Sequence, residues 1–152
     1  MKAFLFTTAL LLGSTLAHAT DPIEGNWRQI DDRTGFTLSL VNIHPDSNGN
    51  YVATIYKRYP RPGHMNELCQ NCPPPYTNKP ILGMDIVTGL KPTNTPGRYV
   101  DGLVIDPNKG KTYKFNARLH PNGRSLTVRG YVGVSMLGRS QTWIRVDENT
   151  RE

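Results

Sequence analysis

Short turn signals divide most of this 152-residue sequence into runs rich in Val, Ile, Thr, Tyr and Phe. The signals are Asp32–Gly35, Asn48-Gly49, Pro96-Gly97, Asn108–Gly110 and Asn122-Gly123. Asn-Gly is favoured in tight hairpins because both residues tolerate a positive φ. Apolar residues almost never recur at the spacing of a helix. The sequence therefore predicts an all-β fold with eight strands, at 25–32, 36–44, 51–59, 81–90, 98–106, 111–119, 125–133 and 139–146.

The run from Lys111 to His120 has the clearest strand alternation. One face carries Tyr113, Phe115, Ala117 and Leu119, and the other carries polar and charged residues. In the next run, a shared face holds Leu126, Val128 and Val132, with Gly130 between them as the expected site of a bend. The stretch Leu38–Val41 breaks the alternation, which predicts a β-bulge there.

The two ends of the predicted sheet carry related features. Gly25-Asn26-Trp27 begins the first strand, and the last strand, from Arg139 to Val146, is rich in Trp and Arg. This pairing indicates an antiparallel sheet whose last strand returns to its first. Closure into a barrel removes exposed edges. The interior of an eight-stranded barrel is either filled by side chains or holds one small ligand.

The region from Tyr59 to Pro80 interrupts the series of hairpins. Six prolines preclude regular strand pairing across most of it, and it contains both cysteines. Long loops in compact domains are often functional. We therefore expect a long loop or lid here.

The first 19 residues have the pattern of a secretory signal peptide. Lys2 provides the positive charge, an apolar run follows, and Ala17-His18-Ala19 matches a cleavage site, so the mature chain is expected to begin at Thr20. The apolar run is shorter than the roughly 20 residues that span a bilayer, so we expect no transmembrane segment in the mature protein. Residues 20–152 then form a single domain that is periplasmic or secreted.

The charge pattern argues against nucleic acid as a partner. The sequence has a net charge of +6, but its basic residues are scattered singly among polar and apolar ones and form no dense stripe. We expect neither a cofactor nor a metal.

Motifs spread along the whole expected mature chain resemble one family. They are Asp21–Trp27, Cys69–Pro73, Pro80–Met84 with Gly89-Leu90, Ile105–Pro107 with Gly110–Tyr113, Val128–Gly133 and Leu137–Trp143. In this order they are similar to the exported bacterial proteins called domain of unknown function 2147. The resemblance implies a lipocalin-like (calycin-type) periplasmic barrel with no established activity.

The resemblance also implies structural roles for residues of the first and last strands, namely Gly25, Trp27, Arg139, Trp143 and Arg145. In lipocalins, the Gly-x-Trp tryptophan near the barrel base packs under an arginine from the closing strand. Arg139 and Arg145 are both candidates for that partner. A guanidinium group stacked on an indole ring contributes about 0.5–2 kcal/mol.

Three interpretations compete for Cys69 and Cys72. In an oxidising compartment, a local disulfide that pins the loop is the favoured one. A thiol–disulfide exchange site is less favoured, since no βαβ pattern lies nearby. A metal site with His64 would have only three local ligands, whereas structural zinc sites usually have four.

The remaining polar residues give no catalytic pattern. His44 and His120 precede prolines and are expected to be exposed turn residues, and Asp32 and Asp106 are expected in turns. Asp85, between Met84 and Ile86, is expected to be half-buried and to pair with an arginine across the sheet such as Arg129.

Eight large apolar or aromatic residues are expected to line the barrel interior: Leu82, Met84, Ile86, Tyr113, Phe115, Leu126, Val128 and Tyr131. The inner face of an amphipathic strand looks identical in a packed core and in a cavity wall, so these residues fit either. The lipocalin resemblance favours a cavity.

Three functions follow, in this order. The first is binding or carriage of a small apolar or amphipathic molecule. The second is an envelope interaction protein that uses the 59–80 loop as its contact surface. The third, well behind, is a thiol oxidoreductase acting through Cys69 and Cys72.

Overall fold

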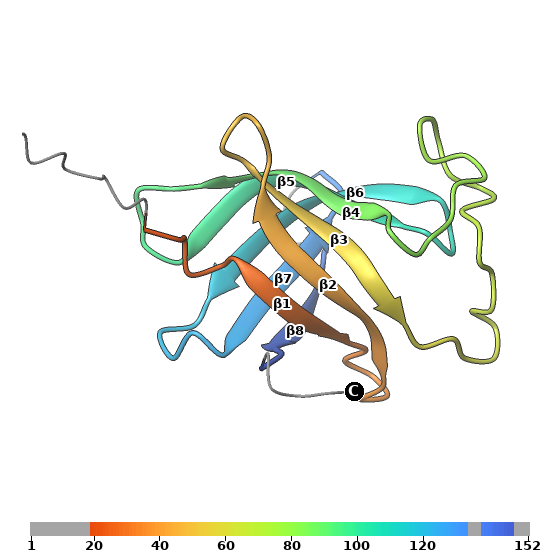
Figure 1. Ribbon diagram of the computed structural model, residues 1–152, viewed down its shortest axis with the longest axis horizontal. Coiled ribbons are helices and arrows are strands. Elements are labelled where there is room, and N and C mark those ends of the chain that lie inside the picture. Colours follow the sequence, from red (N-terminus) through yellow and green to blue (C-terminus); the bar gives the residue numbers. More distant parts are fainter. Residues whose placement is uncertain (1–18, 134–137, 148–152) are drawn as a thin grey trace, which may run out of the picture.

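The computed structural model describes residues 19–133 and 138–147, which contain eight strands and no helix (Figure 1). The strands are β1 (Gly25–Ile30), β2 (Thr37–Pro45), β3 (Tyr51–Arg58), β4 (Asp85–Pro92), β5 (Arg98–Asp106), β6 (Lys111–Leu119), β7 (Ser125–Tyr131) and β8 (Arg139–Arg145). The expected signal peptide falls almost entirely on residues 1–18, outside the described part. None of the described residues belongs to a helix long and apolar enough to cross a membrane.

The eight strands form one closed antiparallel barrel. Each strand pairs with the next in sequence, and β8 pairs with β1 through Trp27 opposite Arg145. The expected return of the last strand to the first is confirmed, and so is the all-β fold. The loops β1–β2, β3–β4 and β5–β6 lie at one end, toward the right in Figure 1, which we call the open end. The opposite end, which holds the chain entry before β1, we call the closed end.

The clearest error in the predicted strands is the start of β4. The expected strand began at residue 81, whereas β4 begins at Asp85. Residues 81–84 form a turn instead, in which Gly83 has a φ of 86° and its amide donates to the Ile55 carbonyl at 2.8 Å. Ile81 and Met84 are buried by this turn, but Leu82 points outward and is 56% exposed. The expectation that Leu82 lines the interior is therefore wrong.

A register shift lies where the broken alternation predicted a bulge. Val41 pairs with Ile55, Leu40 with Lys57 and Ser39 with Arg58, so the additional residue belongs to β3 rather than to β2. At the end of β7, Val132 lies beyond the strand and is 64% exposed, whereas Leu126 and Val128 are buried. Val132 nevertheless faces the same space inside the barrel as Val128 and Gly130, as the expected shared face requires.

Trp27 and Arg145 close the barrel base. Trp27 is fully buried, and its indole Nε1 donates to the Ile23 carbonyl at 2.9 Å. The Arg145 guanidinium lies 4.3 Å from the ring centroid and donates to the carbonyls of Pro22, Glu24 and Gly123. Gly25 is required here, since its φ is 125° and a Cβ would lie 2.8 Å from the guanidinium. Arg139, the other candidate partner of Trp27, lies at the open end.

A second buried polar group lies at the closed end. Tyr51 and Tyr99 pack edge to face, with their ring centroids 5.8 Å apart, and the Tyr99 hydroxyl donates to the Asp21 carboxylate. Burial, together with Asp21, raises the pKa of Tyr51 to about 12 and raises that of Tyr99 as well. These contacts attach the segment before β1 to the barrel wall.

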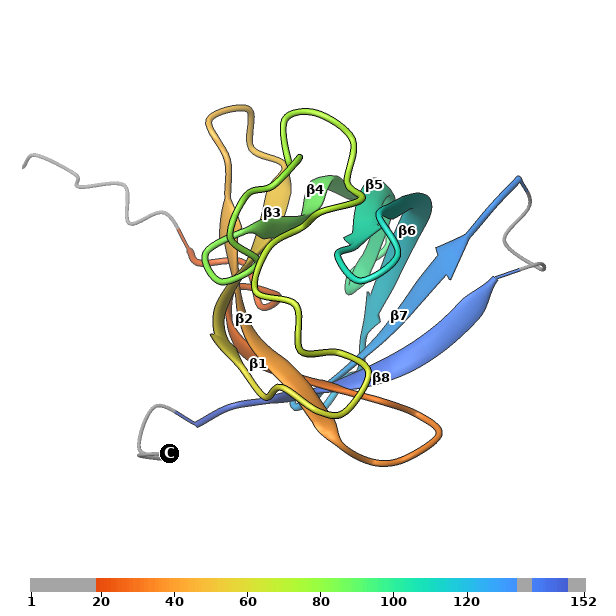
Figure 2. The same cartoon turned by 90° about the vertical axis from the view of Figure 1, so that its right-hand side faces the viewer.

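The long loop before β4 is fastened to the β5–β6 turn. Cys69 and Cys72 form a disulfide, both cysteines are buried, and their sulfur atoms face the Pro107 carbonyl. The contact with the turn is tight: a Cβ on Gly110 would lie only 1.9 Å from the Asn71 carbonyl oxygen. The loop therefore has a fixed position beside the open end, across the front of the barrel in Figure 2.

Candidate functional site: a cavity at the open end

The open half of the barrel contains a cavity of about 500 Å³, within the range of about 300–1,000 Å³ that is usual for small-molecule sites. Residues of the β1–β2, β3–β4 and β5–β6 loops line its mouth. The closed half differs. Between side chains such as Ile43, Tyr51, Leu90 and Leu126, no space large enough for a water molecule remains. The barrel is therefore filled at one end and hollow at the other.

Apolar side chains form much of the cavity wall. They are Ile55, Ile81, Ile86, Val104, Ile105, Phe115, Val128 and Trp143. Trp143 and Phe115 lie at the boundary between the two halves, with ring centroids 5.9 Å apart, and both also contact the packed half. A ligand reaching the floor would thus meet hydrocarbon and aromatic surface.

Along four strands, the inward-facing residues change from apolar to polar toward the mouth. The changes are Trp27 to Gln29 on β1, Val41 to Ser39 on β2, Ile55 to Arg58 on β3, and Trp143 to Gln141 and Arg139 on β8. Gln29, Ser39 and Arg58 lie at one level, because Ser39 pairs with both of the others. The buried Ser39 hydroxyl donates to Gln29 Oε1 at 2.7 Å. The cavity wall formed by β1, β2, β3 and β8 is therefore polar toward the mouth, whereas on β4 and β5 the apolar Ile86 and Ile105 lie near the strand ends at the open end.

The bulge in β3 directs Arg58 inward. Strict alternation from Ile55 would place residue 57 inside and residue 58 outside. The additional residue reverses this order, so Arg58 lies opposite the buried Ser39 and lines the cavity. A bulge is a common means of re-aiming a side chain near a functional site.

Two ion pairs brace the mouth. Arg61 Nη1 lies 3.0 Å from Oδ2 of the buried Asp31, and Arg139 pairs with Asp32. The Arg33 amide and Arg61 both stabilise the Asp31 carboxylate and lower its pKa despite burial. Arg139 likewise lowers the pKa of Asp32. Since Arg61 and Asp31 belong to different loops, the first pair ties the long loop to the β1–β2 loop.

Other polar groups at the cavity wall are less engaged. Among residues 19–133 and 138–147, Arg33, Arg58 and Lys109 have no carboxylate partner, although each lines the cavity. His64 Nδ1 and Asn108 Oδ1 are buried and have no hydrogen-bond partner in the described structure, and both residues line the same cavity. Buried polar atoms are normally hydrogen-bonded. A third such atom, Asn116 Oδ1, does not line the cavity, so the two at the cavity wall are available to a ligand but do not by themselves mark a site.

The expected interior residues divide into three groups. Ile86, Tyr113, Phe115, Val128 and Tyr131 line the cavity. Leu126 belongs to the packed half, and Met84 is buried in the core without lining the cavity. Leu82 is on the surface. A ligand-binding role for the first group remains a prediction.

Three expectations about polar residues are corrected. His44 and His120 are half-buried rather than exposed, because His44 contacts Asn42 at 3.2 Å and His120 contacts Thr127 at 2.7 Å. Asp85 takes its hydrogen bond from the Thr54 hydroxyl, at 2.6 Å, and not from an arginine. Arg129 instead donates to Ser140 on the neighbouring strand.

The cysteines fit the favoured interpretation, a local disulfide. Sulfur atoms bonded to each other cannot serve as thiolate ligands beside His64. Exchange with a substrate thiol requires access to a sulfur atom, and the two cysteines are 0% and 5% exposed. The disulfide therefore stabilises the loop at the mouth.

Sequence reasoning missed the polar half of the cavity. Arg58 could have been found only from a break in alternation on β3, and Asp31 only from its contact with Arg61, which is 30 positions away in sequence. Lys109 and Asn108 were recognised only as turn residues.

Comparison with known proteins agrees with this fold. The structure of HP1028 from Helicobacter pylori, described as belonging to the lipocalin family, matches with a TM-score of 0.70 and 21% sequence identity over 85% of this chain and 86% of that chain. No curated protein sequence matches this one significantly. A family model described as an uncharacterized protein conserved in bacteria (DUF2147) matches residues 25–145, which hold all eight strands. The chain therefore belongs to the DUF2147 family and has a lipocalin-like barrel.

Proposed function

We propose that this protein binds and carries a small apolar or amphipathic molecule in the cavity of the barrel, in the periplasm or after secretion. The observation that carries the proposal is the contrast within one barrel. In the closed half, the side chains around Ile43 and Leu90 leave no space large enough for a water molecule, whereas the open half contains a cavity of about 500 Å³ above an apolar floor. Binding, rather than catalysis, also suits a site in which both cysteines are buried in a disulfide.

A plugged cavity provides the test. Gly130 lines the cavity, and a Cβ built on it would lie 3.6 Å from Val104 Cγ1 and 3.8 Å from Tyr113 Cβ, so a larger side chain there points into the cavity. Gly130→Leu and, as a second plug, Val128→Phe should abolish binding of the neutral fluorescent probe N-phenylnaphthylamine. Wild type should bind the probe and be stabilised by it in thermal unfolding.

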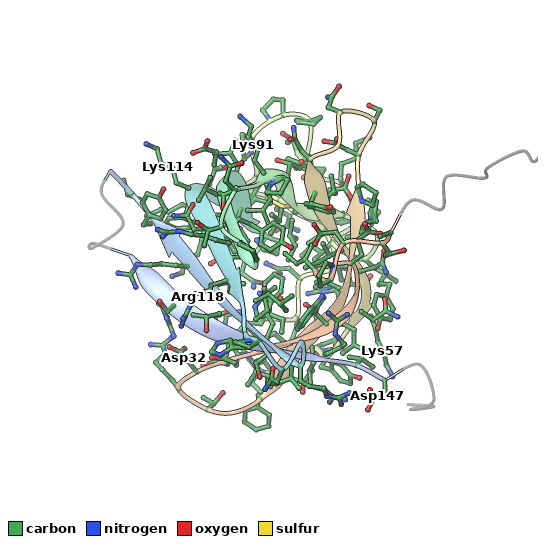
Figure 3. The ribbon with its side chains drawn as sticks, turned by 90° about the vertical axis from the view of Figure 1, so that its left-hand side faces the viewer. Asp32, Lys57, Lys91, Lys114, Arg118 and Asp147 are labelled. Carbon is green, nitrogen blue, oxygen red and sulfur yellow. A yellow bond between two sulfur atoms is a disulfide. The ribbon has the colours of Figure 1, made fainter. Side chains whose placement is uncertain are left out.

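Lys114→Leu is the matched control, because Lys114 is exposed on the outside of the barrel (Figure 3). It adds the same apolar side chain without entering the cavity and should bind the probe like wild type. Failure of wild type to bind, or undiminished binding by both folded plug variants, would contradict the proposal.

A second function, as an envelope interaction protein, draws support from the surface of the long loop. Met65 and Leu68 are 63% and 40% exposed there. Large apolar side chains gathered on a surface can mark an interaction site. Met65→Ser with Leu68→Ser should then reduce recovery of a crosslinked partner and leave probe binding intact. Unchanged crosslinking in this variant would count against the second function.

A further inference from the structure

We propose that the ligand is a single-tailed amphiphile with an anionic head, a carboxylate or a phosphate, bound with its tail on the apolar floor and its head beside Arg58 at the mouth. This inference rests on the proposed function and specifies the chemistry of the molecule in the same cavity. Arg33 and Lys109 lie further out along the same mouth.

The charged side chains at the mouth favour a ligand with an anionic head group. The acidic residues that line the cavity are already engaged: Asp31 accepts from Arg61 and from the Arg33 amide, and Asp106 accepts from the amides of Asn108 and Lys109. The guanidinium of Arg58 and the charges of Arg33 and Lys109 are not neutralised by any described carboxylate. A cationic head would meet uncompensated like charge here.

The position of Arg58 makes it the principal contact. It is half-buried, whereas Arg33 and Lys109 are exposed. It lies at the level where the wall changes from apolar to polar, beside Ser39 and Gln29. A guanidinium group can bind a carboxylate or a phosphate through two parallel hydrogen bonds, and such charge-assisted bonds are stronger when partly shielded from water. An anionic head bound here leaves its tail directed at the floor.

Two unpartnered polar atoms also lie at the mouth of the cavity. The side chains of His64 and Asn108, from the long loop and the β5–β6 turn, reach the cavity with a buried nitrogen and a buried oxygen that have no partner among the described residues. Leaving such atoms unsatisfied is costly. His64 Nδ1 can donate to an anionic head when it carries the ring proton, whereas Asn108 Oδ1 only accepts and so needs a donor such as the O–H of a singly ionised phosphate.

The test compares four ligands that share a twelve-carbon chain and differ in their head group. Affinities of wild type for laurate, dodecyl phosphate, dodecanol and dodecyltrimethylammonium are measured by calorimetry, below the concentrations at which each forms micelles. At least one anion should bind about tenfold more tightly than dodecanol, as expected for a charge-assisted hydrogen bond, and the cation should bind most weakly. The tighter of the two anions identifies the head as carboxylate or phosphate.

Variants of Arg58 test whether the preference for an anion arises at the mouth of the cavity. Arg58→Gln should lower the affinity for the preferred anion about tenfold and leave that for dodecanol unchanged, and Arg58→Lys should keep part of the preference. Arg118→Gln, on the exposed outer face of β6, is the matched control and should match wild type (Figure 3).

The outcomes separate this inference from the proposed function. Equal affinity for anion and alcohol in wild type would overturn the anionic head while leaving a carrier of neutral molecules. An anion preference that survives Arg58→Gln would overturn the placement of the head beside Arg58. If neither these amphiphiles nor the neutral probe binds, the proposed function itself is wrong.

Discussion

The two ends of the barrel use similar residues for opposite purposes. At the closed end, Arg145 stacks on Trp27 and donates to three backbone carbonyls, so its charge and its hydrogen-bonding groups are used internally. At the open end, Arg58 also faces the interior but borders a cavity, without a described carboxylate partner. An inward-facing arginine is therefore a structural residue where the chain surrounds it and a candidate binding residue where it does not.

The clusters of polar side chains differ between the closed end and the open end in the same way. Asp21, Tyr51 and Tyr99 satisfy one another beneath the chain entry, whereas His64 and Asn108 keep unpartnered buried atoms at the mouth. The polar groups at the closed end are thus used within the protein, whereas the open end leaves interactions available to a ligand. Each prediction below tests whether this separation holds.

The largest expected effect is the loss of packing at the closed end. Trp27→Ala removes a fully buried side chain beneath Arg145 and should lower the free energy of unfolding by about 3–5 kcal/mol. Ile86→Ala, on the cavity wall, should cost about 2 kcal/mol, the low end of the range for such changes, because one side of Ile86 already lacks packing partners. Urea unfolding followed by circular dichroism measures both. Equal costs would mean that the open half is packed as tightly as the closed half.

A smaller effect is expected from the tyrosines at the closed end. Tyr51 has a pKa of about 12, above the reference value of about 10, so the fold favours its neutral form. The stability from this preference is fully present below about pH 10 and is lost as the pH rises toward 12. Tyr51→Phe removes the group that resists ionisation, so it should lose less stability between pH 10 and 12 than wild type does.

Urea unfolding at several alkaline pH values measures this difference in slope. Tyr131→Phe, at the cavity, is the matched control for loss of a tyrosine hydroxyl group. If Tyr51→Phe and wild type lose stability in parallel above pH 10, Tyr51 does not hold its proton as a buried group of the closed end.

The fold was largely predictable because its signals are local. Hairpin turns and alternation in 111–119 depend on neighbouring residues, so all eight strands were expected close to their observed places. The error at β4 arose where tertiary contact decided the outcome: Ile81 and Met84 are apolar because a turn buries them, and the strand starts only afterwards.

The site was less predictable, since its character depends on pairing register and on how side-chain volumes add up across strands. Val128 and Leu126 alternate identically on β7, yet one borders the cavity and the other the packed half. The inward position of Arg58 depends on a bulge opposite Leu40 and Val41, and the broken alternation of β2 indicated only that a bulge was near.

The smallest expected effect is at Gly130, which was interpreted as a bend. Its φ is not positive, and an added Cβ would make only ordinary contacts with Val104 and Tyr113 at the cavity wall. Gly130→Ala should therefore raise the free energy of unfolding by about 0.4–1 kcal/mol, because alanine restricts the unfolded chain without straining the fold. Gly25→Ala, at the closed end, should instead destabilise, since φ is 125° and the Arg145 guanidinium occupies the position of the methyl group. Urea unfolding of both variants measures whether each change raises or lowers the free energy of unfolding. A destabilised Gly130→Ala would show that the open half has no room for even one methyl group, and the difference between the two ends would disappear.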